Sequence, residues 1–311
     1  MGLLQPVNGN ERQSLKAIIE SKNGPRRARL KSLTSRILRR YKLYAKHSSD
    51  LALLSRSKFQ GIEREDCEHC YHHETTPLSH LKEKVVAVLP ASSTLFCPLC
   101  GLSFWDTFDH FAPKSVFPEF SVLPKNLVPC CWKCNHLKGD SWLVGQPLPV
   151  LNVYFDKWPQ KRFLEASVDF DPNAGALVTF SLARKSFGRI PRDRHQKHFE
   201  RLKLDRRFAA AGASAVDGYR RSLSHQGYSD RRERKRYLRQ EAGALAEKHG
   251  PNHWESVLLD ALADCDAFLD SPKLSPLARG QRRKAFIHLG ENSLESRVKA
   301  LAVASDLGNV S

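Results

Sequence analysis

Four cysteines in two Cys-x-x-Cys pairs are the residues of this chain best suited to bind a metal. Cys97 and Cys100 form the first pair, and Cys131 and Cys134 form the second. Each such turn presents two thiolates to one ion, and four thiolates complete the tetrahedral shell that Zn²⁺ prefers. We therefore predict a structural zinc that stabilises a segment too short to form its own hydrophobic core. Cys130 is an alternative ligand to Cys131, although the spacing favours Cys131.

Two residues between the cysteine pairs, Asp109 and His110, have side chains that phosphodiester hydrolysis requires. The pKa range of histidine suits a general base that takes a proton from water. The carboxylate of Asp109 offers a hard oxygen to Mg²⁺ or Mn²⁺, and the amide of Asn135 offers a second oxygen. Asn126 can hold the imidazole, either directly or through the loop after His110. The sequence therefore predicts a hydrolytic site with a catalytic Mg²⁺ or Mn²⁺ beside the structural zinc.

The spacing of these residues restricts the backbone that carries them. Neighbours in a regular strand point to opposite faces, so we expect Asp109 and His110 at the end of a strand or at a bulge. Pro113 supports a strand that ends there. His136 is a rival to Asn135, but adjacent residues on a helix point about 100° apart, so only one of them faces the site.

The order and spacing of residues from Asp109 to Gly139 resemble the HNH endonuclease family. The pattern reads Asp-His-x-x-Pro-x-Ser, then Asn-Leu-x-Pro, then Cys-x-x-Cys-Asn-x-x-Lys-Gly. The resemblance implies a ββα-metal finger with His110 as general base. It further implies that Asp109 and Asn135 are metal ligands, that Asn126 is a structural asparagine, and that the four cysteines hold the zinc beneath the finger. Asn135 stands where the family name expects a histidine, and asparagine is a known substitute there.

The charge of the chain predicts a polyanionic partner. Its 50 lysines and arginines exceed its 33 acidic residues, which gives a formal net charge of +17 in 311 residues. Together with a phosphodiesterase motif, this charge favours nucleic acid. The family resemblance favours DNA, with RNA as the alternative. The candidate phosphate contacts are Lys114, Lys125 and Lys138 around the site and Arg36 and Arg40 on a basic helix.

The cellular setting is predicted from what the chain lacks and from how its cysteines are arranged. The eight cysteines do not scatter as a disulfide framework would, and no apolar run approaches membrane-spanning length. We expect a cytoplasmic protein that does not insert into a membrane. The chain has no nucleotide-binding glycine loop, so any ATP use requires a regulatory partner such as an ATPase. Analogy with similar nucleases suggests a restriction or phage-defence effector.

The elements that must position the site are predicted to give an α+β fold in a mostly helical chain. We expect a partly ordered arm over residues 1–24, a basic amphipathic helix over 25–55, and strands over 149–182 that include a hairpin turning at 172–175. The expected segments are a basic helical region at 1–92, the finger with its zinc at 93–145, a small β region that packs on the finger at 146–190, and a C-terminal helical bundle at 191–311. Within the finger we expect a hairpin over residues 95–111, a second strand over 126–130, and a helix over about 132–137 that stops at Gly139.

A third Cys-x-x-Cys pair, Cys67 and Cys70, is followed by His72 and His73. The sequence leaves two interpretations open: a second zinc site that uses one of the histidines, or a turn without metal.

Two functions fit these residues. The first is a metal-dependent HNH endonuclease that hydrolyses phosphodiester bonds in DNA. The alternative is a non-catalytic zinc-knuckle module that binds nucleic acid or a protein. The set of Asp109, His110 and Asn135 separates the two, because binding alone does not require it.

Overall fold

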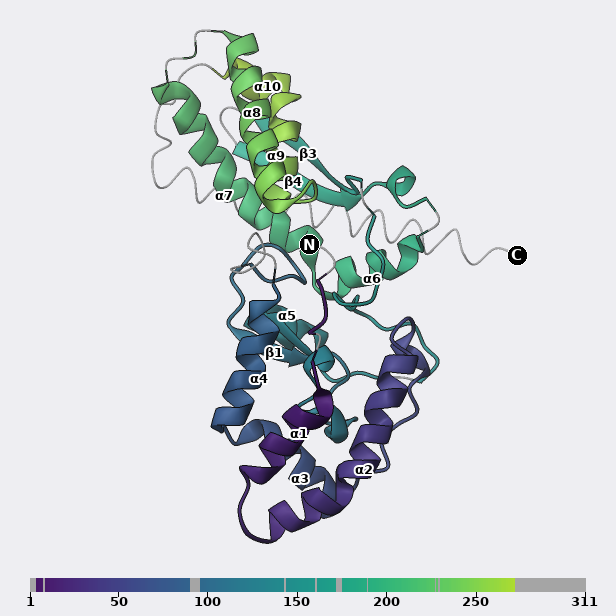
Figure 1. Cartoon of the computed structure of the whole chain (residues 1–311). Helices are drawn as coiled ribbons and strands as arrows, with labels where there is room; N and C mark the ends of the chain where they lie inside the picture. The colour runs from purple at the N-terminus through teal and green to yellow at the C-terminus, as the bar shows by residue number, and fades with distance from the viewer. Residues whose placement is uncertain are drawn as a thin grey trace, which may run out of the picture. The chain divides into compact units, whose positions relative to one another are not determined.

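The computed structural model (Figure 1) describes residues 4–271, apart from residues 8, 90–95, 143, 160, 172–174, 189, 227 and 229. Contacts within the chain define two compact units, which are described separately. The first consists of Met1–Phe163, Leu182–Leu204 and Lys248–His253, and the second of Leu164–Ser181, Asp205–Glu247 and Trp254–Ser311. Helices are combined with two-stranded sheets, which confirms the predicted α+β class. The finer division at residues 92, 145 and 190 stays a prediction.

The first helix of the chain, α1 (Glu11–Glu20), lies in the segment that was predicted to be a partly ordered arm. Leu15, Ile18 and Ile19 are buried, and their spacing places them on one face of the helix. Three apolar residues at that spacing are enough to dock a short helix, so the prediction for residues 1–24 was wrong.

The second helix, α2 (Gly24–Lys46), carries the predicted apolar stripe. Its buried residues are Leu30, Leu33, Ile37, Tyr41 and Tyr44. The stripe is therefore confirmed, but the helix ends at Lys46 rather than near Ser55. After Lys46 the chain turns, and Leu51–Leu53 forms a separate 3-10 helix with Leu51 buried.

The third Cys-x-x-Cys pair lies within a regular helix, α3 (Gly61–His72), rather than in the turn that was one of the two interpretations left open. The residues Cys67 and Cys70 are buried on the inner side of this helix. In the part of the chain that the structure describes, no third ligand residue converges with them, whereas the other two pairs do converge. The cysteines of α3 are thus placed as core residues.

The finger contains an antiparallel sheet of β1 (Thr107–His110) and β2 (Leu127–Cys130). Asp109 pairs with Val128 across this sheet, and His110 is the last residue of β1. The predicted strand end at His110 is confirmed. The hairpin predicted over residues 95–111 was wrong, because the partner of β1 is β2 and only a single bridge joins Phe96 to Phe104.

Two helices flank the sheet of the finger in the sequence: α4 precedes β1, and α5 follows β2. The helix α5 (Trp132–Lys138) follows β2 almost directly and ends at Gly139, where the φ of 62° is a conformation that glycine favours. This stop was predicted at the same glycine. The helix α4 (Thr76–Ala87) lies beside the sheet (Figure 1) and buries Leu78, Leu81 and Val85.

The second unit contains the sheet of β3 (Leu164–Asp171) and β4 (Gly175–Leu182), as the sequence predicted. Most of its remaining structure is helical. The helices are α7 (Leu204–His225), α8 (Arg231–His249), α9 (Trp254–Ala263) and α10 (Asp266–Asp270). In the first unit, residues 150–155 form no strand although they begin the range of 149–182 in which strands were predicted, since the chain turns there. The turn at 172–174 and the chain beyond residue 271 lie outside the described residues.

Ion pairs neutralise one side of α8 in the second unit. Arg231, Lys235 and Arg239 are spaced four residues apart, so they lie on one face of the helix. Their partners are Asp266 and Asp270 for Arg231, Asp264 for Lys235, and Asp260 and Asp264 for Arg239. No helix within the described residues is both long enough and apolar enough to cross a membrane.

Candidate metal centre and active site

The four predicted zinc ligands meet in the interior of the first unit. The sulfur atoms of Cys97, Cys100, Cys131 and Cys134 all lie within 4.8 Å of one another, and all four residues are buried. Burial raises the pKa of the Cys97 thiol well above its usual range, so a buried thiolate here needs a cation. Four converging sulfurs fit a structural metal such as zinc.

Cys130, the alternative ligand, is buried in β2 and lies outside this group of converging sulfurs. Since neighbouring strand residues point to opposite faces, Cys130 and Cys131 cannot both face the metal. The structure thus brings together the cysteines that the Cys-x-x-Cys spacing favoured.

His198, which the sequence analysis missed, supports the first cysteine pair from α6 (Arg192–Arg201). Its Nε2 donates a hydrogen bond to the carbonyl oxygen of Leu99 at 2.8 Å, and its Nδ1 accepts one from the amide of Leu151 at 3.2 Å. Burial lowers the pKa of His198 to about 4, which keeps the ring neutral. A lone histidine far along the chain carried no sequence signal for this contact.

His110 is held in one tautomer at the end of β1. Its Nε2 lies 2.8 Å from the carbonyl oxygen of Ser121. A carbonyl oxygen only accepts hydrogen bonds, so Nε2 carries the ring proton and the lone pair of the neutral ring stays on Nδ1. Burial lowers the pKa of His110 to about 3, so the ring is neutral at neutral pH. Among the described residues, Nδ1 has no hydrogen-bond partner, which leaves it able to accept a proton.

Asp109 is buried, and only one of its carboxylate oxygens is satisfied. Its Oδ1 accepts a hydrogen bond from Nζ of Lys138 at 3.0 Å, whereas Oδ2 is buried without a partner in the described structure. Burial raises the pKa of Asp109, and the charge of Lys138 opposes that shift. A buried carboxylate oxygen without a partner is costly, and a cation at this position would remove that cost.

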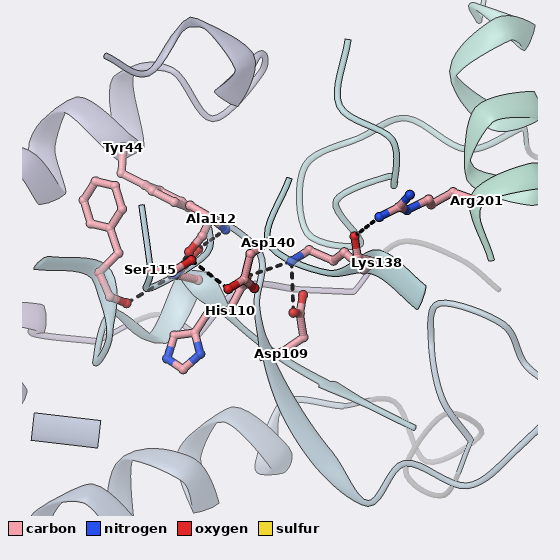
Figure 2. Close-up of polar contacts among 10 residues, drawn as sticks. Tyr44, Asp109, His110, Ala112, Ser115, Lys138, Asp140 and Arg201 are labelled. Carbon is pink, nitrogen blue, oxygen red and sulfur yellow. Dashed lines mark hydrogen bonds and ion pairs between the residues drawn. The ribbon is translucent and has the colours of Figure 1, made fainter. Parts of the chain in front are cut away.

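The side chains of Asp109 and His110 leave the strand in different directions (Figure 2), as neighbours in a strand do, so the strand end does not bring them onto one face as the sequence predicted. Lys138 links the two residues, because Nζ also donates to the carbonyl oxygen of His110 at 2.9 Å. Asn135 lies three residues before Lys138, so the two share one side of α5. In the described structure the side chain of Asn135 makes no hydrogen bond, so its amide oxygen remains available.

Asn126 fixes the loop between the two strands of the finger. Its Oδ1 accepts hydrogen bonds from the amide of Ala112 at 2.7 Å and from the hydroxyl of Tyr44 at 3.2 Å. Its Nδ2 donates to the carbonyl oxygens of Ala112 at 3.0 Å and Phe120 at 3.2 Å. Because Phe120 precedes Ser121, Asn126 positions His110 through the loop rather than by direct contact.

Replacing Asn126 with alanine is expected to lower the free energy of unfolding by about 3–5 kcal/mol, since three buried backbone groups lose their partner at once. Urea unfolding at fixed zinc concentration measures the loss. Asn135→Ala is the matched control and should change stability by less than about 1 kcal/mol, because that side chain is half-buried and makes no hydrogen bond within the described residues. Equal losses in the two variants would contradict the role of Asn126.

Tyr71 of α3 is a second residue that the sequence analysis missed. Its ring packs edge-to-face on the imidazole of His110, with centroids 4.3 Å apart and planes at 79°. Burial raises the pKa of Tyr71 to about 12, so its hydroxyl keeps its proton at neutral pH. Sequence reasoning treated this stretch as possible metal ligands, and nothing local indicated a contact with His110.

Most of the predicted phosphate contacts are engaged in ion pairs with residues of the protein. The pairs are Arg36 with Glu63, Arg40 with Glu119, Lys125 with Glu11, and Lys138 with Asp109. The carboxylate of Glu119 is fully buried, and it accepts from Nε of Arg40 at 2.6 Å. Arg40 thus anchors the loop before Ser121, which is a structural role.

The ammonium of Lys138 is buried rather than on the rim of the site, and Lys114 remains half-buried near His110. Contacts of these five residues with nucleic acid stay predictions.

Comparison with known proteins identifies one relative. The chain is 26% identical over 191 residues to "Protein ea31" of Escherichia phage lambda. The matched region is 55% of this chain and 62% of that protein, so the chain spans less than two thirds of its relative. No family model and no solved structure matches the chain.

Proposed function

We propose that this protein is a metal-dependent endonuclease of the HNH type that hydrolyses phosphodiester bonds in DNA. The observation that carries the proposal is the state of His110: a neutral ring whose proton is held on Nε2 by Ser121, with Nδ1 available as a base. The buried and unpaired Oδ2 of Asp109, on the adjacent residue, supplies the ligand atom that a catalytic cation needs.

In this mechanism, His110 activates the water molecule that attacks the phosphate. Nδ1 of His110 takes a proton from a water molecule, and the resulting hydroxide attacks the phosphorus in line with the leaving 3′ oxygen. The bond from phosphorus to that oxygen then breaks, and the oxygen takes up a proton from solvent. A negative phosphate beside the ring raises the pKa of His110 from its low value and makes it a stronger base.

Asp109 and Asn135 are the residues that would hold Mg²⁺ or Mn²⁺, and such a cation supplies positive charge to the phosphate and to the leaving oxygen. The fit rests on the donor set, since a carboxylate and a neutral amide leave positions for water and phosphate. Lys138 already provides a positive charge at Asp109. The four cysteines and Asn126 keep β1, β2 and α5 in register around this site.

The non-catalytic alternative, a zinc module that only binds, requires the cysteines and the basic charge alone. It gives no reason for a tautomer fixed by Ser121 or for a buried carboxylate oxygen without a partner. These two features favour the enzyme.

Incubation of the purified protein with plasmid, linear duplex, single-stranded DNA and RNA tests the proposal. We expect cleavage of DNA in Mg²⁺ or Mn²⁺ and none after the loosely bound cation is removed by dialysis, which leaves the zinc in place. Products should carry a 5′ phosphate. If every substrate stays intact with each cation, although the protein is folded and contains zinc, the proposed activity is wrong and the binding module remains.

A further inference from the structure

An open apolar cleft of about 410 Å³ lies between α4 and β1 in the first unit. Its lining residues are Lys82, Glu83, Val86, Ala87, Trp105 and Phe108. The rings of Trp105 and Phe108 form one wall, with centroids 5.8 Å apart, and a face of α4 forms the other. Both rings are partly exposed to solvent.

Side-chain contacts connect the cleft with His110, the proposed general base. Phe108 and His110 are two residues apart in β1, so their side chains share one face of the strand, about 7 Å apart. Tyr71 continues the row of rings, because it packs on His110 on one side and lies 5.0 Å from the ammonium of Lys82 on the other. Lys82 also lines the cleft, so Lys82 and Tyr71 connect its lining to the ring of His110.

We propose that this cleft binds the base of an unpaired nucleotide next to the scissile phosphate, so that the substrate is single-stranded or locally unpaired DNA. The inference rests on the proposed nuclease function and names its substrate class. A base offers a flat apolar face, which matches the two aromatic rings, and stacking of this kind tolerates any base. The spacing from His110 to Phe108 also matches the distance between a phosphate and its neighbouring base.

The chemistry of the cleft argues against an intact duplex. Bases inside a duplex are already stacked on one another, so their faces cannot reach an aromatic wall unless the base leaves the stack. The ammonium of Lys82 in the lining also favours a nucleotide over an apolar peptide. Lys82 contacts the ring of Tyr71 and forms a partly exposed ion pair with Glu74, and an ion pair of that kind is weak enough for a phosphate to replace the carboxylate.

Fluorescence anisotropy with labelled DNA of about 16 nucleotides tests the site. The assay uses protein with His110→Ala, without added Mg²⁺ or Mn²⁺ and without chelator, so that binding is measured separately from cleavage. Trp105→Ala is expected to raise the Kd for the single strand about 5- to 150-fold and to leave the Kd for the same sequence as a duplex within about twofold. Trp105→Phe, which keeps a stacking ring, should restore most of the affinity.

Trp132→Ala is the matched control, because this tryptophan is 60% exposed on α5 and does not line the cleft. It should bind the single strand as the parent does. Phe108→Leu gives a second, milder change to the wall that contains Trp105. Zinc content and circular dichroism verify that each variant is folded. Unchanged single-strand affinity in both cleft variants, or an equal loss for duplex, overturns the base-binding site. Since the assay requires no catalysis, that outcome is distinct from an absence of nuclease activity.

Discussion

Replacing Cys97 with serine is expected to release the zinc and unfold the finger. The four sulfurs converge within 4.8 Å in a buried position, so loss of one thiolate leaves an incomplete shell around the ion. Zinc binding in such modules is worth about 10–16 kcal/mol of apparent free energy, which exceeds the whole stability of a small domain. Wild-type protein should contain one zinc per described four-cysteine site, and the variant much less. Metal analysis and thermal unfolding provide the measurements.

Cys130→Ala provides the control for this prediction. Cys130 is as buried as the four ligands and is adjacent to Cys131, but it lies outside the converging group. It should retain its zinc and lose only the small packing energy of one sulfur, about 1 kcal/mol. Zinc loss in Cys130→Ala together with zinc retention in Cys131→Ser would contradict the assignment of the ligands.

Replacing His110 with glutamine is expected to lower the rate of DNA cleavage about 10²- to 10⁴-fold, because a general base contributes a factor of that size. Glutamine preserves the bulk of the side chain and can donate to Ser121, so the loop should keep its position. Binding of uncleaved DNA should therefore stay within about twofold of the wild type. Single-turnover cleavage and anisotropy measure the two quantities.

His136→Gln is the matched control for the histidine. His136 is exposed on α5 and stacks on Trp132, with planes at 9°. It was the rival to Asn135 in the sequence, but it faces solvent. Its replacement should change the cleavage rate by less than about twofold. A similar loss in both histidine variants would show that the effect is not specific to the proposed base.

The sequence predicted those features that depend on residues close together in the chain. The apolar stripe of α2, the extent of α5 with its glycine stop, and the convergence of two Cys-x-x-Cys pairs each follow from a short repeat or spacing. Strand alternation likewise predicted His110 at the end of β1, although the side chain of Asp109 leaves the strand in another direction. Local patterns of this kind determine the local backbone conformation, so the sequence alone is enough to predict it.

Features that depend on contacts between distant segments could not be predicted. Tyr71 meets His110 from another helix, and His198 supports Leu99 from far along the chain. The ion pair of Lys138 with Asp109 likewise became visible only when α5 was placed against β1. The sequence showed these residues as surface lysines or possible metal ligands, because residue type alone does not specify a partner. The strand expected over residues 150–155 failed for the same reason, since an apolar run can also pack as turns.

A double-mutant cycle of Asp109→Ala and His110→Ala on the single-turnover cleavage rate in Mg²⁺ tests the central claim most directly. We predict that each single variant loses most of the activity and that the double variant is little slower than the slower single one, because the two residues act on one water and one phosphate. If the fold-losses of the two single variants multiply in the double variant, the two residues do not share a site at the end of β1. Full cleavage by either single variant would also contradict a shared site.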